Sequence, residues 1–227
     1  WVPYQSQTNP DQDYHTYEEG DEGLIGRFGL KSQIATLDDF TADAFQSDMS
    51  ITSPMRPHEL HNPDSMEDDY FSGVDIDLET LNITADYVRL LEIPEREIPV
   101  GDGELIFSDL GCDVCHTPSL RTYADYPVQI LADIDAPIYS DMLLHDMGAS
   151  AADGIIQFDA GSTEWRTAPL IGLRFLRNYM HDGRAQTVED AILAHGSEGS
   201  EAGEVIENFK KLSEDEQISL IEFVSSL

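Results

Sequence analysis

Two cysteines and a histidine stand together near the middle of the chain, in the segment Cys112-Asp113-Val114-Cys115-His116. Thiols spaced by two residues can add to the two vinyl groups of one haem, and the adjoining imidazole then meets the iron. The sequence has 2 cysteines in all, so no further thiol can complete a four-sulfur zinc site or an iron–sulfur cluster. The segment therefore predicts one covalent c-type haem, with His116 as an iron ligand.

Two other kinds of site also use a cysteine pair. A redox-active dithiol needs no histidine after it, and a zinc site would have to recruit His145 or His181 from far along the chain. A haem is the interpretation that uses both thiols and the imidazole of His116. Because covalent haem attachment takes place outside the cytoplasm, we expect a periplasmic or extracellular protein.

The second axial ligand of the iron is not settled by spacing. His195 lies at the end of a predicted helix and continues its apolar face, so its ring should point into the interior, as a ligand or as a core histidine. Met180 follows His116 by 64 residues (180 minus 116), a separation that would suit a His/Met pair, or else packs beside its neighbour in the core. The remaining candidates are His15, His58, His61, His145, His181, Met142 and Met147.

Helical patterns flank the cysteine segment on both sides. We expect helices at about 37–49, after a capping residue at Thr36, and at about 78–91, with acidic, proline-containing loops around them. An apolar stripe of Leu105, Ile106 and Leu110 runs into Cys112. Three short helices should close the chain, at about 188–195, 201–211 and 214–224, while 117–167 has few helix signals.

These patterns predict a mainly α protein. Its larger part, residues 97–227, should be a cytochrome c-like haem domain with long irregular loops. A smaller helix-containing N-terminal segment, residues 1–96, should precede it, with the boundary near 95–101, where the composition changes.

The chain is strongly acidic. It has 45 Asp and Glu against 12 Lys and Arg, a net charge of -33, so nucleic acid and anionic membrane surfaces would repel it. A basic redox partner is one explanation of this charge, and an acidic coat suited to a salty habitat is the other. No stretch approaches the roughly 20 consecutive apolar residues of a membrane span. The first residue is Trp1 and no signal peptide is visible, so we expect a processed protein or a piece of a longer one.

Several motifs together resemble the C-terminal half of the bacterial di-haem cytochrome c peroxidase superfamily, and within it the di-haem thiol oxidoreductase branch. The resemblance covers nearly the whole chain, and its most specific parts are the haem segment and the histidine motif near residue 181. Its motifs are Gly26-Arg27-Phe28-Gly29, Ala42-Asp43-Ala44-Phe45, Ile51-Thr52-Ser53-Pro54, the haem segment with Gly111 and Thr117-Pro118, Tyr139-Ser140-Asp141, His145-Asp146-Met147-Gly148, Glu164-Trp165-Arg166-Thr167 and His181-Asp182-Gly183-Arg184.

The resemblance implies a distal ligand and a partner. In such relatives the distal ligand of the C-terminal haem follows the motif histidine by fourteen residues, as Met or Tyr; here that position is His195 (181 plus 14). The relatives are about twice as long, and their N-terminal half carries a second haem motif that this sequence lacks. The resemblance therefore implies a second haem-bearing domain or chain, which would hold the peroxidatic haem.

Three functions fit these observations. The first is electron transfer by a low-spin haem, as the electron-transfer half of a di-haem system. The second is a peroxidase-like or thiol-oxidising enzyme that acts with a second haem, and the third is a structural, self-assembling cytochrome. No catalytic residue can be assigned from the sequence.

Two further groups of residues are candidates for smaller roles. Trp165 and Arg166 could line the haem, the first as an aromatic on an electron path and the second as the partner of a propionate. Core packing and a surface ion pair are the alternatives. The acidic cluster Asp75, Asp77 and Glu79 could bind calcium or be a solvated loop.

Overall fold

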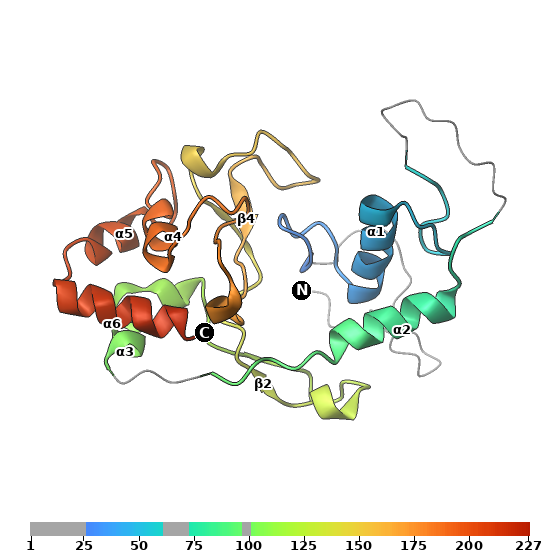
Figure 1. Ribbon diagram of the computed structural model, residues 1–227, viewed down its shortest axis with the longest axis horizontal. Coiled ribbons are helices and arrows are strands. Elements are labelled where there is room, and N and C mark those ends of the chain that lie inside the picture. Colours follow the sequence, from blue (N-terminus) through green and yellow to red (C-terminus); the bar gives the residue numbers. More distant parts are fainter. Residues whose placement is uncertain (1–25, 61–72, 97–100) are drawn as a thin grey trace. The chain divides into compact units, whose positions relative to one another are not determined.

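The regular structure of this chain consists of short helices and still shorter strands. The computed structural model describes residues 26–60, 73–96 and 101–227, and within them it has six α-helices and two two-stranded sheets (Figure 1). The helices are α1 (Leu37–Met49), α2 (Leu78–Arg89), α3 (Gly103–Leu110), α4 (Val188–Ala194), α5 (Gly203–Phe209) and α6 (Glu214–Ser225). The strands are β1 (Leu120–Arg121), β2 (Asp135–Ala136), β3 (Leu144–Asp146) and β4 (Glu164–Arg166).

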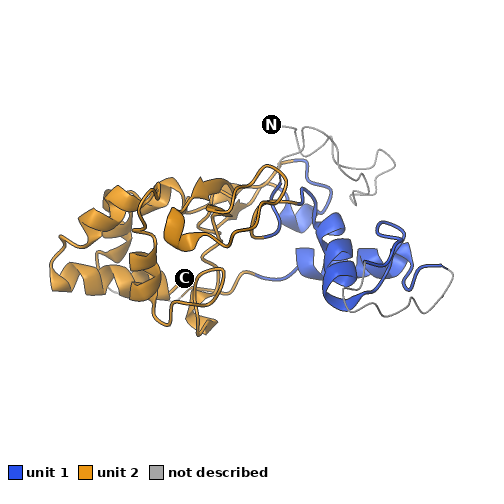
Figure 2. Cartoon of the chain, turned by 90° about the horizontal axis from the view of Figure 1, so that it is seen from above, with its two compact units in different colours: residues 1–29, 34–92, 125–132 blue, residues 30–33, 93–124, 133–227 orange. Residues whose placement is uncertain are grey.

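The chain divides into two compact units (Figure 2). Unit 1 takes residues 1–29, 34–92 and 125–132, and unit 2 takes residues 30–33, 93–124 and 133–227. Two short segments therefore belong to a different unit from their sequence neighbours. The boundary that the sequence predicts, near 95–101, includes residues 97–100, which lie outside the described residues, so it stays a prediction.

Unit 1 is built on α1 and α2. Thr36 caps α1 by accepting a hydrogen bond from the Asp39 backbone N–H at 3.2 Å, as its sequence position predicts. Ala42, Leu81 and Ala85 are fully buried. The Arg89 side chain reaches from α2 to the buried Asp38 of α1 at 2.9 Å, so this ion pair joins the two helices.

The candidate calcium ligands of unit 1 have structural partners. The Asp75 carboxylate accepts hydrogen bonds from the backbone N–H and the hydroxyl of Thr52, at 2.8 and 2.7 Å. Asp77 caps α2 by accepting from the Thr80 backbone N–H at 2.8 Å. Asp75 therefore holds the loop at Thr52, and Asp77 holds the start of α2. Calcium binding by the cluster stays a prediction.

The core of unit 2 lies between α3 and α6. Phe107 of α3 packs edge-on against Phe223 of α6, with ring centroids 5.5 Å apart, and Phe209 and Leu220 are buried beside them. Gly103 permits this crossing, since a Cβ there would lie 2.2 Å from the Ser219 carbonyl oxygen. The helix α3, which leads into the haem segment, is thus fixed against the C-terminal helix.

The end of the chain follows the capping signals in its sequence. Thr187 and Asp190 form a capping box at the start of α4, and Ser213 and Glu216 form another at the start of α6. The helix predicted at 201–211 is shorter than expected, because α5 is Gly203–Phe209. Within the described residues, no helix combines the length and the apolar character needed to cross a bilayer.

The stretch 117–167 contains two small sheets that the sequence pattern did not predict. In one of them β3 and β4 pair antiparallel, with Leu144 opposite Arg166, His145 opposite Trp165 and Asp146 opposite Glu164. Strands of two or three residues are too short to show an alternating pattern. They nevertheless fix the stretch next to the haem segment.

Candidate haem site

The haem segment begins where α3 ends. Gly111 terminates the helix in the left-handed conformation, with φ +88°, which a residue with a side chain rarely adopts. A single 3-10 turn, Cys112–Val114, follows, and the His116 backbone N–H donates to the Cys112 carbonyl at 2.9 Å. This tight turn places both cysteines and the histidine at the end of one helix.

His116 is oriented by a backbone carbonyl. Its Nδ1 lies 3.0 Å from the carbonyl oxygen of Tyr139, and its ring packs beside Phe107. A carbonyl only accepts, so Nδ1 carries the proton and Nε2 keeps its lone pair for a metal. Burial lowers the pKa of His116 to about 4, although the bond to Tyr139 acts in the opposite direction. The imidazole is therefore neutral at physiological pH.

His195 repeats this arrangement on the other side. It is the C-terminal capping residue of α4, and its Nδ1 lies 2.7 Å from the carbonyl oxygen of Ala191, one turn earlier. Burial lowers the pKa of His195 as well. His195 is therefore a second neutral imidazole whose Nδ1 is bonded to the backbone.

The separation of the two rings fits a single metal between them. The ring centroids of His116 and His195 are 6.3 Å apart, with an angle of 60° between the ring planes. Imidazole nitrogens bind metals at about 2.0 Å and lie about 1.1 Å from the ring centroid, so two rings on opposite sides of one metal have centroids about 6 Å apart. No hydrogen bond among the described residues uses Nε2 of either ring. The donor set thus fits a haem iron.

Both thiols of the segment have raised pKa values. Burial, with a smaller effect of Asp113, raises the pKa of Cys112 to about 11. Burial and the nearby Asp141 and Glu201 also raise the pKa of Cys115. A redox-active dithiol exchanges through its thiolate, so these raised pKa values weigh against that alternative.

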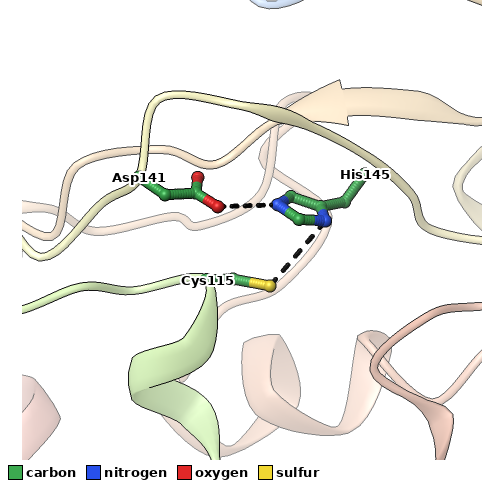
Figure 3. A group of neighbouring side chains, drawn as sticks. All are labelled: Cys115, Asp141 and His145. Carbon is green, nitrogen blue, oxygen red and sulfur yellow. Dashed lines mark hydrogen bonds and ion pairs between the residues drawn. The ribbon is translucent and has the colours of Figure 1, made fainter.

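Beside Cys115 lies a group of polar side chains (Figure 3). The His145 ring has Nε2 at 2.9 Å from an Asp141 carboxylate oxygen and Nδ1 at 2.8 Å from a Glu201 oxygen, while the Cys115 sulfur lies 3.8 Å from Nδ1. Burial lowers the pKa of His145, but the hydrogen bonds to Glu201 and Asp141 outweigh it and the pKa is raised. Both ring nitrogens face carboxylates, which suits the doubly protonated imidazolium.

Cys115, Asp141 and His145 have ligand atoms close enough to surround a metal ion, within 4.8 Å of one another. A metal there would need the Cys115 thiolate, whereas haem attachment would convert this sulfur into a thioether. A haem at Cys115 and a separate metal ion in this group would therefore exclude each other.

Trp165 and Arg166 lie on β4, next to the site. One face of the buried Trp165 indole stacks on His181, at 3.6 Å between centroids, and the Lys31 ammonium lies 4.2 Å from its ring centroid. The Trp165 Nε1–H donates to the Ala151 carbonyl at 3.0 Å. These contacts are typical of a packed indole in a core. The Lys31 ammonium beside the ring also makes Trp165 harder to oxidise.

Arg166 is half-buried, and burial lowers its pKa. Its guanidinium donates to the Thr167 carbonyl at 3.2 Å and to the Met142 sulfur at 3.6 Å. A haem contact of Arg166 or Trp165 stays a prediction.

The other candidate ligands have other surroundings. His145 lies between its two carboxylates, His181 is stacked on Trp165, and the Met142 sulfur accepts from Arg166. His58 belongs to unit 1, and Met147 donates its backbone N–H to Thr163. Met180 is half-buried and has φ +70°. His15 and His61 lie outside the described residues. In the part of the chain that the structure describes, His195 is the candidate whose ring contacts His116.

Tyr139 and Glu201 were not found by sequence reasoning. Tyr139 orients His116 through its backbone carbonyl, which has no side-chain signature. Glu201 meets His145 across 56 residues and stands among many other acidic residues. The one available signal was the position of Tyr139 and Asp141 together in one of the motifs quoted above.

Comparison with known proteins gives a family. A family model described as "Di-haem oxidoreductase, putative peroxidase" matches residues 18–227. No curated protein matches the chain. Among solved structures, a chain of Kuenenia stuttgartiensis hydrazine synthase pressurised with xenon is similar, with 20% identity and a TM-score of 0.45. The match covers 70% of this chain and 58% of that one. The present chain thus spans little more than half the length of its structural match.

Proposed function

Because the chain belongs to the di-haem oxidoreductase family, we propose that it transfers electrons through one haem attached to Cys112 and Cys115, with the iron held between His116 and His195. Family membership alone makes it a haem-bearing redox protein. The proposal adds the number of haems on this chain, the ligand pair and the role.

One observation carries the proposal: the 6.3 Å separation of the two neutral imidazole rings. Each ring is tied to a backbone carbonyl through Nδ1, so each is held in one tautomer and one orientation. If both imidazoles bind the iron of a haem, they would leave it no open position for peroxide. Such an arrangement favours storing and passing electrons over reacting with a substrate.

The residues of the chain have distinct tasks in this proposal. A bound haem c supplies one-electron iron chemistry. Cys112 and Cys115 would attach it at the end of α3, and the Tyr139 and Ala191 carbonyls keep the imidazoles of His116 and His195 oriented. The aromatic cluster around Phe107 excludes water from the His116 side, and a dry site limits the reorganisation that accompanies a change of charge.

The family name implies a second haem that one attachment motif cannot supply. We propose that this chain corresponds to the C-terminal half of a di-haem thiol oxidoreductase, and that its partner is another haem-bearing domain or chain. The net charge of -33 favours a partner with a basic surface. We propose a periplasmic or extracellular location on the same ground, because covalent haem attachment takes place outside the cytoplasm.

Spectra of the haem-loaded chain test the ligand pair. Wild-type protein should give low-spin absorption and electron paramagnetic resonance spectra, and His195→Met should change the resonance positions and raise the reduction potential. Met180→Leu is the matched control and should leave both unchanged. A high-spin, five-coordinate wild-type spectrum, or a Met180→Leu spectrum that differs while His195→Met does not, would refute the proposal.

The family description also favours a second candidate function, peroxidase-like or thiol-oxidising catalysis together with a second haem. Steady-state peroxide turnover by the isolated chain, retained in His195→Ala, would support this candidate over electron transfer. Turnover that appears only after His195 is removed would instead show that the native ligand closes the site.

A further inference from the structure

Residues 139–148, which we call the clamp segment, contact both sides of the candidate haem site. At its beginning, the Tyr139 carbonyl accepts from His116 Nδ1, and the Asp141 backbone N–H donates to the Cys115 carbonyl at 2.8 Å. At its end, Asp146 and Glu201 exchange two hydrogen bonds, both of 2.9 Å. The clamp segment therefore joins the His116 side to the loop that follows His195.

That loop is short and tightly packed. Residues 195–201 lead from the C-terminal end of α4 toward α5, and the Ser200 backbone N–H donates to the Ser197 carbonyl at 3.0 Å. At Gly148, a Cβ would lie 2.5 Å from the Glu198 carbonyl oxygen, so the clamp segment and the loop touch backbone to backbone. Glu201 and His195 thus stand at the two ends of one closely packed loop.

His145 forms the polar centre of the clamp segment. It bridges Asp141, beside Cys115, and Glu201, at the far end of the loop. His145 and Asp141 are largely buried, with 18% and 14% of their side-chain surface exposed, whereas Glu201 is 55% exposed. A charge-assisted hydrogen bond between buried groups is stronger than one between exposed groups. The His145 imidazole bonds to Asp141 on the His116 side and to Glu201 in the loop that follows His195.

We propose that the Asp141–His145–Glu201 bridge is a positioning device that keeps His195 in place as the sixth ligand, so that losing the bridge opens the iron to added ligands. This inference rests on the proposed function, because it needs His195 to bind the iron. The three residues act through the loop and do not bind iron themselves. The bridge would then decide whether the site is a closed electron carrier or a site open to peroxide.

The test uses the full chain with its haem attached. Glu201→Ala removes the two bonds of the Glu201 side chain, to His145 and to the Asp146 backbone N–H, and keeps the bond from the Glu201 backbone N–H to the Asp146 carbonyl. Glu201→Gln keeps an acceptor for the Asp146 N–H and a donor for a neutral His145, so it is the conservative variant. Glu198→Ala is the matched control, an exposed glutamate in the same loop whose side chain has no hydrogen bond among the described residues.

Spin state and ligand binding give readouts that a general loss of stability would not change. Glu201→Ala should raise the ratio of high-spin to low-spin haem about tenfold at a temperature where the far-ultraviolet circular dichroism is that of the wild type. It should also bind cyanide faster, and added imidazole should restore the low-spin spectrum. Glu201→Gln and Glu198→Ala should match the wild type in all three measurements.

The possible outcomes distinguish the positioning role of the bridge from the proposed ligand pair. A low-spin wild type together with a low-spin, cyanide-resistant Glu201→Ala variant overturns the positioning role and leaves the ligand pair intact. An equal effect of Glu198→Ala also overturns it. A high-spin wild type overturns the proposed function and the inference with it. His145→Phe keeps the ring volume, removes both hydrogen bonds and gives the same reading where Glu201→Ala does not fold.

Discussion

Replacing Gly103 by alanine should destabilise unit 2 at the crossing of α3 and α6. An added Cβ would lie 2.2 Å from the Ser219 carbonyl oxygen and 2.6 Å from the Phe223 Cβ. Favourable contacts between carbon atoms are at about 3.5–4.0 Å, so the contact with the Phe223 Cβ would be too short by about 1 Å. The nearest atom belongs to the backbone of α6, which can relieve the overlap only if the whole helix moves.

Two opposing effects set the size of the change. Alanine is favoured over glycine within a helix by up to about 1 kcal/mol, and less at a first position such as 103. Overpacking a core costs about 1–3 kcal/mol, and moving α6 would also disturb Leu220 and Phe223. We therefore expect a net loss of about 1–2 kcal/mol, or a fall in melting temperature of about 2–8 °C.

Gly203 provides the matched control. It is also the first residue of a helix, α5, but a Cβ there would meet nothing within 4 Å. Gly203→Ala should leave the free energy of unfolding unchanged or raise it. Urea unfolding, followed by circular dichroism and by haem absorbance, measures both variants. A Gly103→Ala variant as stable as Gly203→Ala would refute the argument from close packing.

Three further changes probe other parts of unit 2. Gly148→Ala should lower stability by about 1–3 kcal/mol and raise the high-spin fraction, because the new Cβ meets the Glu198 carbonyl in a residue with φ +75°; urea unfolding and absorption spectra measure this. Trp165→Phe should lower the melting temperature, because the hydrogen bond and part of the packing of Trp165 are lost. It should leave the rate of electron exchange unchanged in stopped-flow measurements. A slower rate with unchanged stability would place Trp165 on the electron path. A hydrogen bond from Arg184 lowers the pKa of Asp182 to about 2. The ionised Asp182 therefore stabilises the folded state above about pH 4, and this stabilisation is lost as the pH falls toward 2. The difference in urea midpoint between wild type and Asp182→Asn should therefore disappear over that range.

Local sequence patterns predicted the helices of this fold but not the short strands between them. The capping residues Thr187 and Ser213 mark the starts of α4 and α6, because a cap is a property of a few consecutive residues. The strands β3 and β4 escaped prediction because three-residue strands depend on their partner and not on their own sequence.

The candidate site divides in the same way. The spacing of Cys112 and Cys115 and the apolar face ending at His195 can be read along the chain, so these three residues could be selected before the structure was known. The bridge from Asp141 through His145 to Glu201 depends on contacts across 56 residues, and nothing near Glu201 distinguishes it from other glutamates. Side chains that position a ligand are found only once the fold brings their segments together.

The way His195 is held bears on whether this chain is a carrier or a catalyst. Its Nδ1 bonds to the Ala191 carbonyl in the last turn of α4, so the ring is oriented without any help from a metal. A Cβ on the next residue, Gly196, would lie 2.8 Å from Ile206, so the chain after the ring packs closely on α5. A preorganised imidazole binds with little loss of conformational entropy, and the six-coordinate state is favoured accordingly. If an assembly containing this chain reduces peroxide, the reacting iron should therefore be the partner's, unless something first breaks the bridge at Glu201.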